Sequence, residues 1–356
     1  MLLVVPGPNT VFFTRLEQIE PWSLAMTSQN VHELARRPLY TDEQLDLFLS
    51  KLPCKPNLNL SGFKQEKHDD ELLALTKLQR LAMAFIPWTS VSLHYSTHHT
   101  LSLNPTLLFR KIVERQLGGY CMENNTFFSN ILRSLGYRCY VAGARISNAE
   151  GGATGIEAQG FGGWSHEVIL VLIGSKKYLV DVGFGGHGSI EPTLVEEGAT
   201  AQGVPGVTHH LVRRKLAPFT SDQELWLVEV HIRKEGASGP EDENAAWQPA
   251  YCFADQEWLP QDFEITNYRV SRDPRSMFTY RVLVTKTVLD ESGEHAIGQR
   301  VLINEEATER SRDGKKTILR TCKSEAERVD ALARWFDMNL TPEEVDGIRG
   351  RVTAIK

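Results

Sequence analysis

The strongest constraint on the fold is a change in the spacing of apolar residues near Gly136. Before this glycine, apolar residues recur every three or four positions, which is the period of an amphipathic helix. One such series is Leu72, Leu75, Leu78, Leu81 and Phe85. After it, apolar and β-branched residues form short runs of the kind found in strands. The chain is therefore expected to begin with helices and to continue mainly with strands.

Capping and turn residues place the boundaries of these elements. Thr41 and Gln44 have the spacing of a capping box. Pro87 ends the helix over 72–85, and Pro105 opens another. The expected strands are 138–146, 166–173, 178–182, 211–215, 224–233, 280–289, 300–304 and 316–322. The expected later helices are 261–270 and one capped by Ser324, and the expected loops are 57–67, 147–163 and 234–244.

The stretch at 118–125 carries the clearest chemical signal. Cys121 follows Gly118 and Gly119 at the expected start of a helix over 122–135. The glycines allow a tight approach and unusual backbone angles. The N–H groups and the positive dipole end of a helix favour thiolate over thiol. A buried, inert cysteine is the competing interpretation, because cysteine is among the most buried residue types.

The composition of the 356-residue chain is that of an ordinary globular protein with two or three domains. A net charge of −6 argues against nucleic-acid binding, and no apolar run reaches the roughly 18 residues of a membrane span. The five cysteines form no CxxC pair, so neither a disulfide frame nor a metal site is expected, and the reducing cytoplasm fits best. Residues 1–26 are expected to be a disordered extension, or an over-long start before Met26.

A nucleophilic cysteine needs a base and a group that orients the base. If residues 174–175 form a two-residue hairpin turn, paired residue numbers on the two strands sum to 349. His166 and Asp181 then lie on the same face as diagonal neighbours, roughly 7–8 Å apart. A strand of Val, Ile and Leu does not normally bury an aspartate without a partner. The pair is compatible with a catalytic triad; the alternative is that Asp181 binds backbone N–H groups at the strand end.

Three motifs in this order resemble the arylamine N-acetyltransferase family. They are GGYCMENN at 118–125, WSH at 164–166 and YLVDVGFGG at 178–186. Supporting segments lie at 86–94, 247–253 and 259–264. The resemblance covers about residues 35 to 340, and the C-terminal segments look most like the fungal members.

The resemblance implies an α+β multidomain fold with an N-terminal helical bundle, a central β-barrel and a C-terminal α/β lid. Its triad would be arranged as in cysteine proteases. The implied boundaries are 27–137 for the helical domain with the cysteine, 138–256 for the barrel with the histidine and aspartate, 257–272 for an interdomain helix and 273–356 for the lid.

The resemblance also implies a ping-pong reaction. Cys121 would attack the thioester of an acyl-coenzyme A, and an arylamine or arylhydrazine would then take the acyl group. His166 would transfer protons in both halves, and Asp181 would orient and stabilise it. The sequence leaves open whether the donor carries an acetyl, propionyl or malonyl group.

Further residues receive roles from the same resemblance. Phe184 and Trp88 would line the acceptor pocket, and the backbones of Gly163, Gly185 and Gly186 would approach coenzyme A. No metal, nucleic acid or membrane partner is implied, and a monomer is expected.

Two other functions stay open at this point. A thiol hydrolase would pass the acyl group of the same Cys–His–Asp site to water, although papain-type sequence around the cysteine is absent and the glycine-rich turn at 183–188 suits a donor with a cofactor better. A non-catalytic relative would use the pocket only to bind aromatic ligands, although retention of all three polar triad residues speaks against that.

Two positions depart from the family pattern. The residue before Gly-Gly-aromatic-Cys is usually Arg and here is Leu117, and the Glu of the family's Pro-Phe-Glu-Asn segment is here Thr89. Loss of the Arg alone would leave a buried carboxylate unpaired, at a cost of several kcal/mol. We therefore hypothesise that the two positions face each other and were exchanged together for a neutral pair.

Reintroducing the charges tests this exchange. Leu117→Arg alone should lower the free energy of unfolding by several kcal/mol, because it buries an unpaired charge. Leu117→Arg combined with Thr89→Glu should lower it less. Chemical denaturation of the two variants measures the difference, and equal stabilities would contradict the hypothesis.

Overall fold

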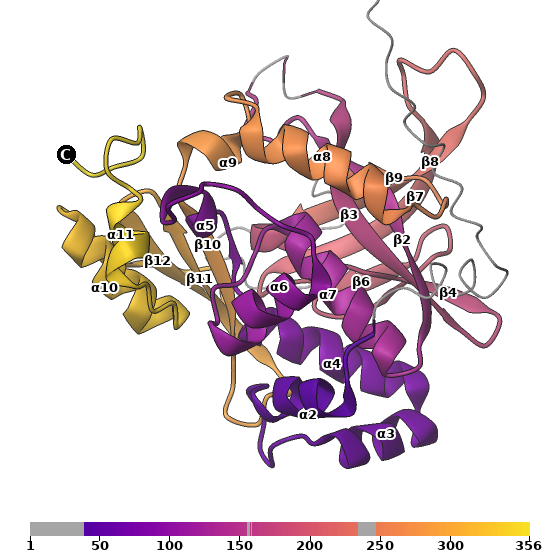
Figure 1. Cartoon of the computed structure of the whole chain (residues 1–356). Helices are drawn as coiled ribbons and strands as arrows, with labels where there is room; N and C mark the ends of the chain where they lie inside the picture. The colour runs from indigo at the N-terminus through magenta and orange to yellow at the C-terminus, as the bar shows by residue number, and fades with distance from the viewer. Residues whose placement is uncertain (1–38, 155–156, 158, 234–246) are drawn as a thin grey trace, which may run out of the picture. The chain divides into compact units, whose positions relative to one another are not determined.

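The computed structural model describes residues 39–154, 157, 159–233 and 247–356. Figure 1 shows the arrangement of its helices and strands. The predicted extension at 1–26 and the predicted loop at 234–244 lie outside the described residues. The domain boundaries implied by the resemblance stay predictions.

Helices make up most of the described chain before residue 135. They are α2 (Asp42–Ser50), α3 (Leu60–Asp69), α4 (Glu71–Phe85), α5 (Val91–His94), α6 (Pro105–Phe109), a π-helix at Arg110–Glu114 and α7 (Cys121–Ser134). The capping box predicted before α2 and the stop predicted before Pro87 are both present. Apolar side chains of the helices, among them Phe48, Leu78 and Phe127, share one core with the strands that follow.

The prediction of a loop over 57–67 is wrong, because α3 occupies most of that segment. Asn59 caps this helix by accepting a hydrogen bond from the Gly62 N–H at 2.8 Å. Leu60 and Phe63, three residues apart, are its buried residues. The remaining side chains are mainly polar, so the helical period is too weak to see in the sequence, and packing of two side chains holds the helix instead.

The first sheet is nearly closed on itself. Its strands are β2 (Arg138–Ser147), β3 (Phe161–Ile173), β4 (Lys176–Val180), β5 (Thr193–Leu194), β6 (Thr200–Gln202), β7 (Val207–Lys215), β8 (Glu224–Ile232) and β9 (Gln248–Phe253). They run in the order β5-β4-β3-β2-β9-β8-β7-β6. Ser189 and Gly203, beside the two edge strands, form a bridge that brings these edges together. This arrangement agrees with the expected α+β class and its barrel.

The hairpin between β3 and β4 has the predicted register. Ile169 pairs with Val180, so the paired residue numbers sum to 349. β4 ends at Val180, however, and Asp181 therefore lies just beyond the strand. β3 begins at Phe161, so the end of the predicted loop 147–163 is strand rather than loop.

The second sheet consists of β1 (Trp88–Thr89), β10 (Leu283–Leu289), β11 (Ala296–Ile303), β12 (Glu306–Ser311) and β13 (Lys316–Thr321), in that order. The strand predicted at 280–289 starts later, because residues Met277–Tyr280 form helix α9. β12 was not predicted. Helix α8 (Pro260–Arg272) precedes β10 in the chain, and α10 (Glu325–Phe336) and α11 (Pro342–Asp346) follow β13.

The two faces of the second sheet have different surroundings. Val284 and Leu302 share an apolar cluster with Leu332 of α10, which is the predicted helix capped by Ser324. Thr285 and other residues of the opposite face line a cavity. One face of the sheet thus stabilises the fold, and the other is available to a ligand.

β1 joins the helical segment to the second sheet. Trp88 pairs with Thr285 of β10, and the Thr89 N–H donates to the Gly119 carbonyl oxygen at 2.9 Å. Positions 89 and 117 therefore lie on neighbouring segments, as their joint exchange requires, and the side chains of Thr89 and Leu117 are both buried. The exchange itself stays a prediction.

Candidate active site

Cys121 is the first residue of α7, and two glycines fix the chain that leads into it. Gly118 has a φ of +59°, in the left-handed region that favours glycine. A Cβ at this position would lie 2.1 Å from the carbonyl oxygen of Pro87. A Cβ on Gly119 would lie 2.6 Å from the Cβ of Glu123. The tight approach and the unusual backbone angle predicted for this stretch are therefore both present.

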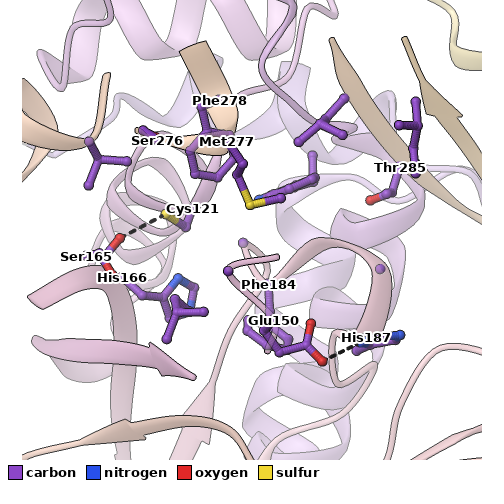
Figure 2. Close-up of a pocket in the computed structure, with 18 of the residues that line it drawn as sticks. Cys121, Glu150, Ser165, His166, Phe184, His187, Ser276, Met277, Phe278 and Thr285 are labelled. Carbon is purple, nitrogen blue, oxygen red and sulfur yellow. Dashed lines mark hydrogen bonds and ion pairs between the residues drawn. The ribbon is translucent and has the colours of Figure 1, made fainter. Parts of the chain in front are cut away.

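Burial sets the resting state of the Cys121 thiol. The residue is 4% exposed. Its sulfur lies 3.7 Å from the Ser165 carbonyl oxygen, at the wall of a cavity of about 750 Å³ (Figure 2). Burial raises the pKa of the thiol well above its usual range, the charge of Asp181 raises it further, and the Met122 N–H acts in the opposite direction. Burial and the charge of Asp181 therefore oppose the thiolate that the helix start favours.

His166 and Asp181 form a buried pair next to this cysteine. His166 Nε2 and Asp181 Oδ2 are 2.6 Å apart, and the two side chains are 1% and 2% exposed. Burial raises the pKa of the Asp181 carboxyl, but His166 and the hydrogen bonds from Asn125 and the Gly183 N–H outweigh burial and lower it. Asp181 is thus an ionised carboxylate that holds one ring nitrogen of His166. Nδ1 is the ring nitrogen left for other chemistry.

Asn125, which the sequence analysis did not single out, ties these segments together. It lies one turn after Cys121 on α7, and its Nδ2 donates to Asp181 Oδ1 at 2.8 Å and to the Glu167 carbonyl oxygen at 2.5 Å. Its Oδ1 accepts the Val182 N–H at 2.9 Å. Residues i and i+4 of a helix share a face, so an amide four residues after a candidate nucleophile was the available signal.

Most of the predicted pocket residues line the same cavity as Cys121 and His166. These residues are Trp88, Phe184, Gly163 and Gly186. Gly185 does not line it: its φ is +75°, and a Cβ there would lie 2.8 Å from the Trp88 ring, so its backbone packs against that ring. Asp181 also lies off the cavity wall, where it contacts His166.

The cavity wall also carries charged residues that the sequence analysis did not identify. Arg269 comes from α8, and Arg310 and Lys316 come from the second sheet. Elsewhere on the wall, His187 Nδ1 and Glu150 Oε1 form a pair at 2.9 Å (Figure 2). The site therefore combines a thiol, an imidazole and aromatic rings with several cations.

Two kinds of feature are absent from the described part of the chain. Within it, no group of three or more His, Cys, Asp or Glu side chains is placed to hold a metal ion. None of the helices described is long and apolar enough to span a membrane.

The sequence has recognisable relatives. A family model described as N-acetyltransferase matches residues 71–345. The chain is 35% identical over 325 residues to N-malonyltransferase FDB2 of Fusarium pseudograminearum (strain CS3096), and the match covers 87% of this chain and 93% of that protein. It is 27% identical over 256 residues to an arylamine N-acetyltransferase of Mycolicibacterium smegmatis, covering 71% and 80% of the two chains.

Solved structures share the fold. The arylamine N-acetyltransferase from Salmonella typhimurium matches with a TM-score of 0.67 at 18% identity, covering 87% of this chain and 98% of that one. The Mycobacterium marinum arylamine N-acetyltransferase in complex with CoA matches with a TM-score of 0.63 at 22% identity, covering 80% and 93%. At these identities the likeness shows the fold alone, and it agrees with the expected α+β architecture.

Gly183 and Gly186 offer a matched test of how the loop after Asp181 fits the cysteine. A Cβ on Gly183 would lie 2.7 Å from the Cα of Cys121, whereas a Cβ on Gly186 would meet nothing within 4 Å. Gly183→Ala should therefore lower the free energy of unfolding by about 1–3 kcal/mol and slow alkylation of Cys121, and Gly186→Ala should do neither. Denaturation and peptide mapping measure the two effects; equal behaviour of the variants would contradict this packing.

Proposed function

Because this chain belongs to the arylamine N-acetyltransferase family and is an N-acyltransferase, we propose that it works through an acyl-cysteine. The acyl group moves from an acyl-coenzyme A to Cys121 and then to the nitrogen of an arylamine or arylhydrazine. His166 is the base, and Asp181 orients it. One observation carries the proposal: an ionised, buried carboxylate holds, at 2.6 Å, an imidazole on the wall of the cavity that also contains the thiol.

In the first half-reaction the proton of the Cys121 thiol passes to His166 Nδ1, since Nε2 is held by Asp181. The thiolate attacks the carbonyl carbon of the thioester, and the bond from that carbon to the coenzyme A sulfur breaks. The departing coenzyme A sulfur takes the proton from His166 and leaves as a thiol. Because burial raises the pKa of the Cys121 thiol, formation of the thiolate depends on the imidazolium that forms with it.

In the second half-reaction the amine nitrogen attacks the acyl carbon, and the bond from that carbon to the Cys121 sulfur breaks. The amine proton passes through His166 to the sulfur, which restores the thiol, and the amide leaves. Phe184 lies with its ring centroid 5.6 Å from that of His166. Its ring and that of Trp88, both on the cavity wall, offer edge and face contacts to an aromatic acceptor.

We propose malonyl-coenzyme A as the preferred donor, ahead of acetyl- and propionyl-coenzyme A. The relatives at 35% and 31% identity are named N-malonyltransferases. Relatives named arylamine N-acetyltransferases, such as those of Mycolicibacterium smegmatis and Rattus norvegicus, are 27% and 21% identical to this chain.

Mass spectrometry of the acyl-enzyme tests the proposed intermediate. Incubation with a mixture of malonyl-, acetyl- and propionyl-coenzyme A and no amine should leave an acyl adduct on Cys121, mostly malonyl. Cys121→Ser is the control and should carry no adduct. Absence of any adduct on Cys121 would falsify the ping-pong mechanism and favour a non-catalytic binding protein.

The fate of the adduct separates transfer from hydrolysis. Addition of an arylamine should discharge the adduct and yield the N-acyl product, whereas buffer alone should leave it in place. Rapid loss of the adduct in buffer, with free acid as the product, would instead identify a thiol hydrolase.

A further inference from the structure

Arg269 brings a cation to the wall of the cavity that contains Cys121. It lies on α8, and its Nη1 is 3.4 Å from the position that a Cβ on Gly163 would occupy. Gly163 precedes Ser165 by two residues on β3, and the Ser165 carbonyl oxygen is 3.7 Å from the Cys121 sulfur. Two residues of a strand span roughly 7 Å. Arg269 and Cys121 thus contact neighbouring positions of β3 and line the same cavity, which places the guanidinium on the wall that an acyl group on the sulfur faces.

Arg269 has no carboxylate bound to it in the part of the chain that the structure describes. The charge of Arg269 lowers the pKa of the Asp273 carboxyl. The two oxygens of Asp273, however, accept hydrogen bonds from Arg275 at 3.0 and 2.8 Å. Those hydrogen bonds hold the pKa of the Asp273 carboxyl at about 2, and the charge of Arg269 is a smaller cause. The planar guanidinium of Arg269 can therefore donate hydrogen bonds to a ligand, and its geometry suits the two oxygens of a carboxylate.

We propose that Arg269 determines donor specificity by binding the free carboxylate of a dicarboxylic acyl group such as malonyl. This role rests on the proposed transfer through Cys121. In a malonyl thioester a single methylene separates the carboxylate from the carbonyl that Cys121 attacks, and a charged hydrogen bond adds roughly 2.8 Å to that span. Acetyl and propionyl groups lack the carboxylate, so Arg269 gives them no advantage.

Arg310 is a comparison residue on another wall of the same cavity. It lies on β12, which is two strands away from β10 in the second sheet. Adjacent strands are about 4.8 Å apart, so the backbone of Arg310 is about 10 Å from β10, the strand that pairs with Trp88. Arg310 thus lines the cavity from the second sheet, whereas Arg269 lies on α8 against Gly163 of β3. Removal of the Arg310 charge should therefore change the acylation rates with malonyl and acetyl donors by the same factor.

The ratio of two acylation rates tests this role. The second-order rate constants for acylation of Cys121 by malonyl- and acetyl-coenzyme A are measured without amine, by mass spectrometry. Arg269→Gln should lower the malonyl rate constant about 10-fold, because a charged hydrogen bond is lost, and change the acetyl rate constant less than about 2-fold. Arg269→Lys should give an intermediate ratio, and Arg310→Gln should leave the ratio unchanged.

Thioesters of N-acetylcysteamine separate the acyl carboxylate from the phosphates of coenzyme A. With malonyl and acetyl thioesters of this short thiol, Arg269→Gln should lower the rate ratio by the same factor as before. Equal losses for both coenzyme A donors, absent with the short thioesters, would assign Arg269 to the phosphates and overturn the proposal. An unchanged ratio would overturn it as well. Failure of wild-type Cys121 to accept any acyl group would refute the proposed function itself.

Discussion

The buried hydrogen bond between His166 and Asp181 is the constraint on which the rest of the site depends. Burying two ionisable side chains to this extent costs several kcal/mol unless each satisfies the other. The hydrogen bonds that satisfy these groups come from three segments: β3 supplies His166, the end of the hairpin supplies Asp181, and α7 supplies Asn125. Packing of α7 against the first sheet therefore positions the Asp181 carboxylate for His166.

Close backbone contacts then place the thiol against this pair. Gly183 packs on the backbone of Cys121, and Gly118 packs on the carbonyl of Pro87, at separations that admit no side chain. Trp88, the next residue after Pro87, pairs with β10 of the second sheet. The start of α7, the loop after Asp181 and the second sheet consequently meet around one cavity. Residues from distant parts of the sequence therefore line the cavity around the Cys121 sulfur.

Features with a local chemical signature could be predicted from the sequence. A two-residue turn fixes every later pair of a hairpin, so the register that brings His166 toward Asp181 was readable from residues 174–175. Helix α3 could not be predicted, because its two buried side chains are too few to show the helical spacing of apolar residues. The spacing of Asn125 from Cys121 indicates a shared helix face, but its contacts with Glu167, Asp181 and Val182 lie far away in the chain and cannot be predicted from it. The place of Arg269 against Gly163 likewise depends on packing between distant segments. The helix start at Cys121 was visible, but the burial that opposes its effect on the thiol was not.

We infer that the buried Cys121 thiol becomes a nucleophile only because the His166–Asp181 pair accepts its proton. The rate of iodoacetamide alkylation at neutral pH, resolved for each cysteine by peptide mapping, tests this most directly. Cys121 should react far faster than the other four cysteines in the wild type, and this preference should disappear in Asp181→Asn with an unchanged circular dichroism spectrum. A wild type without the preference, or an Asp181→Asn variant that keeps it, would contradict this role of the pair.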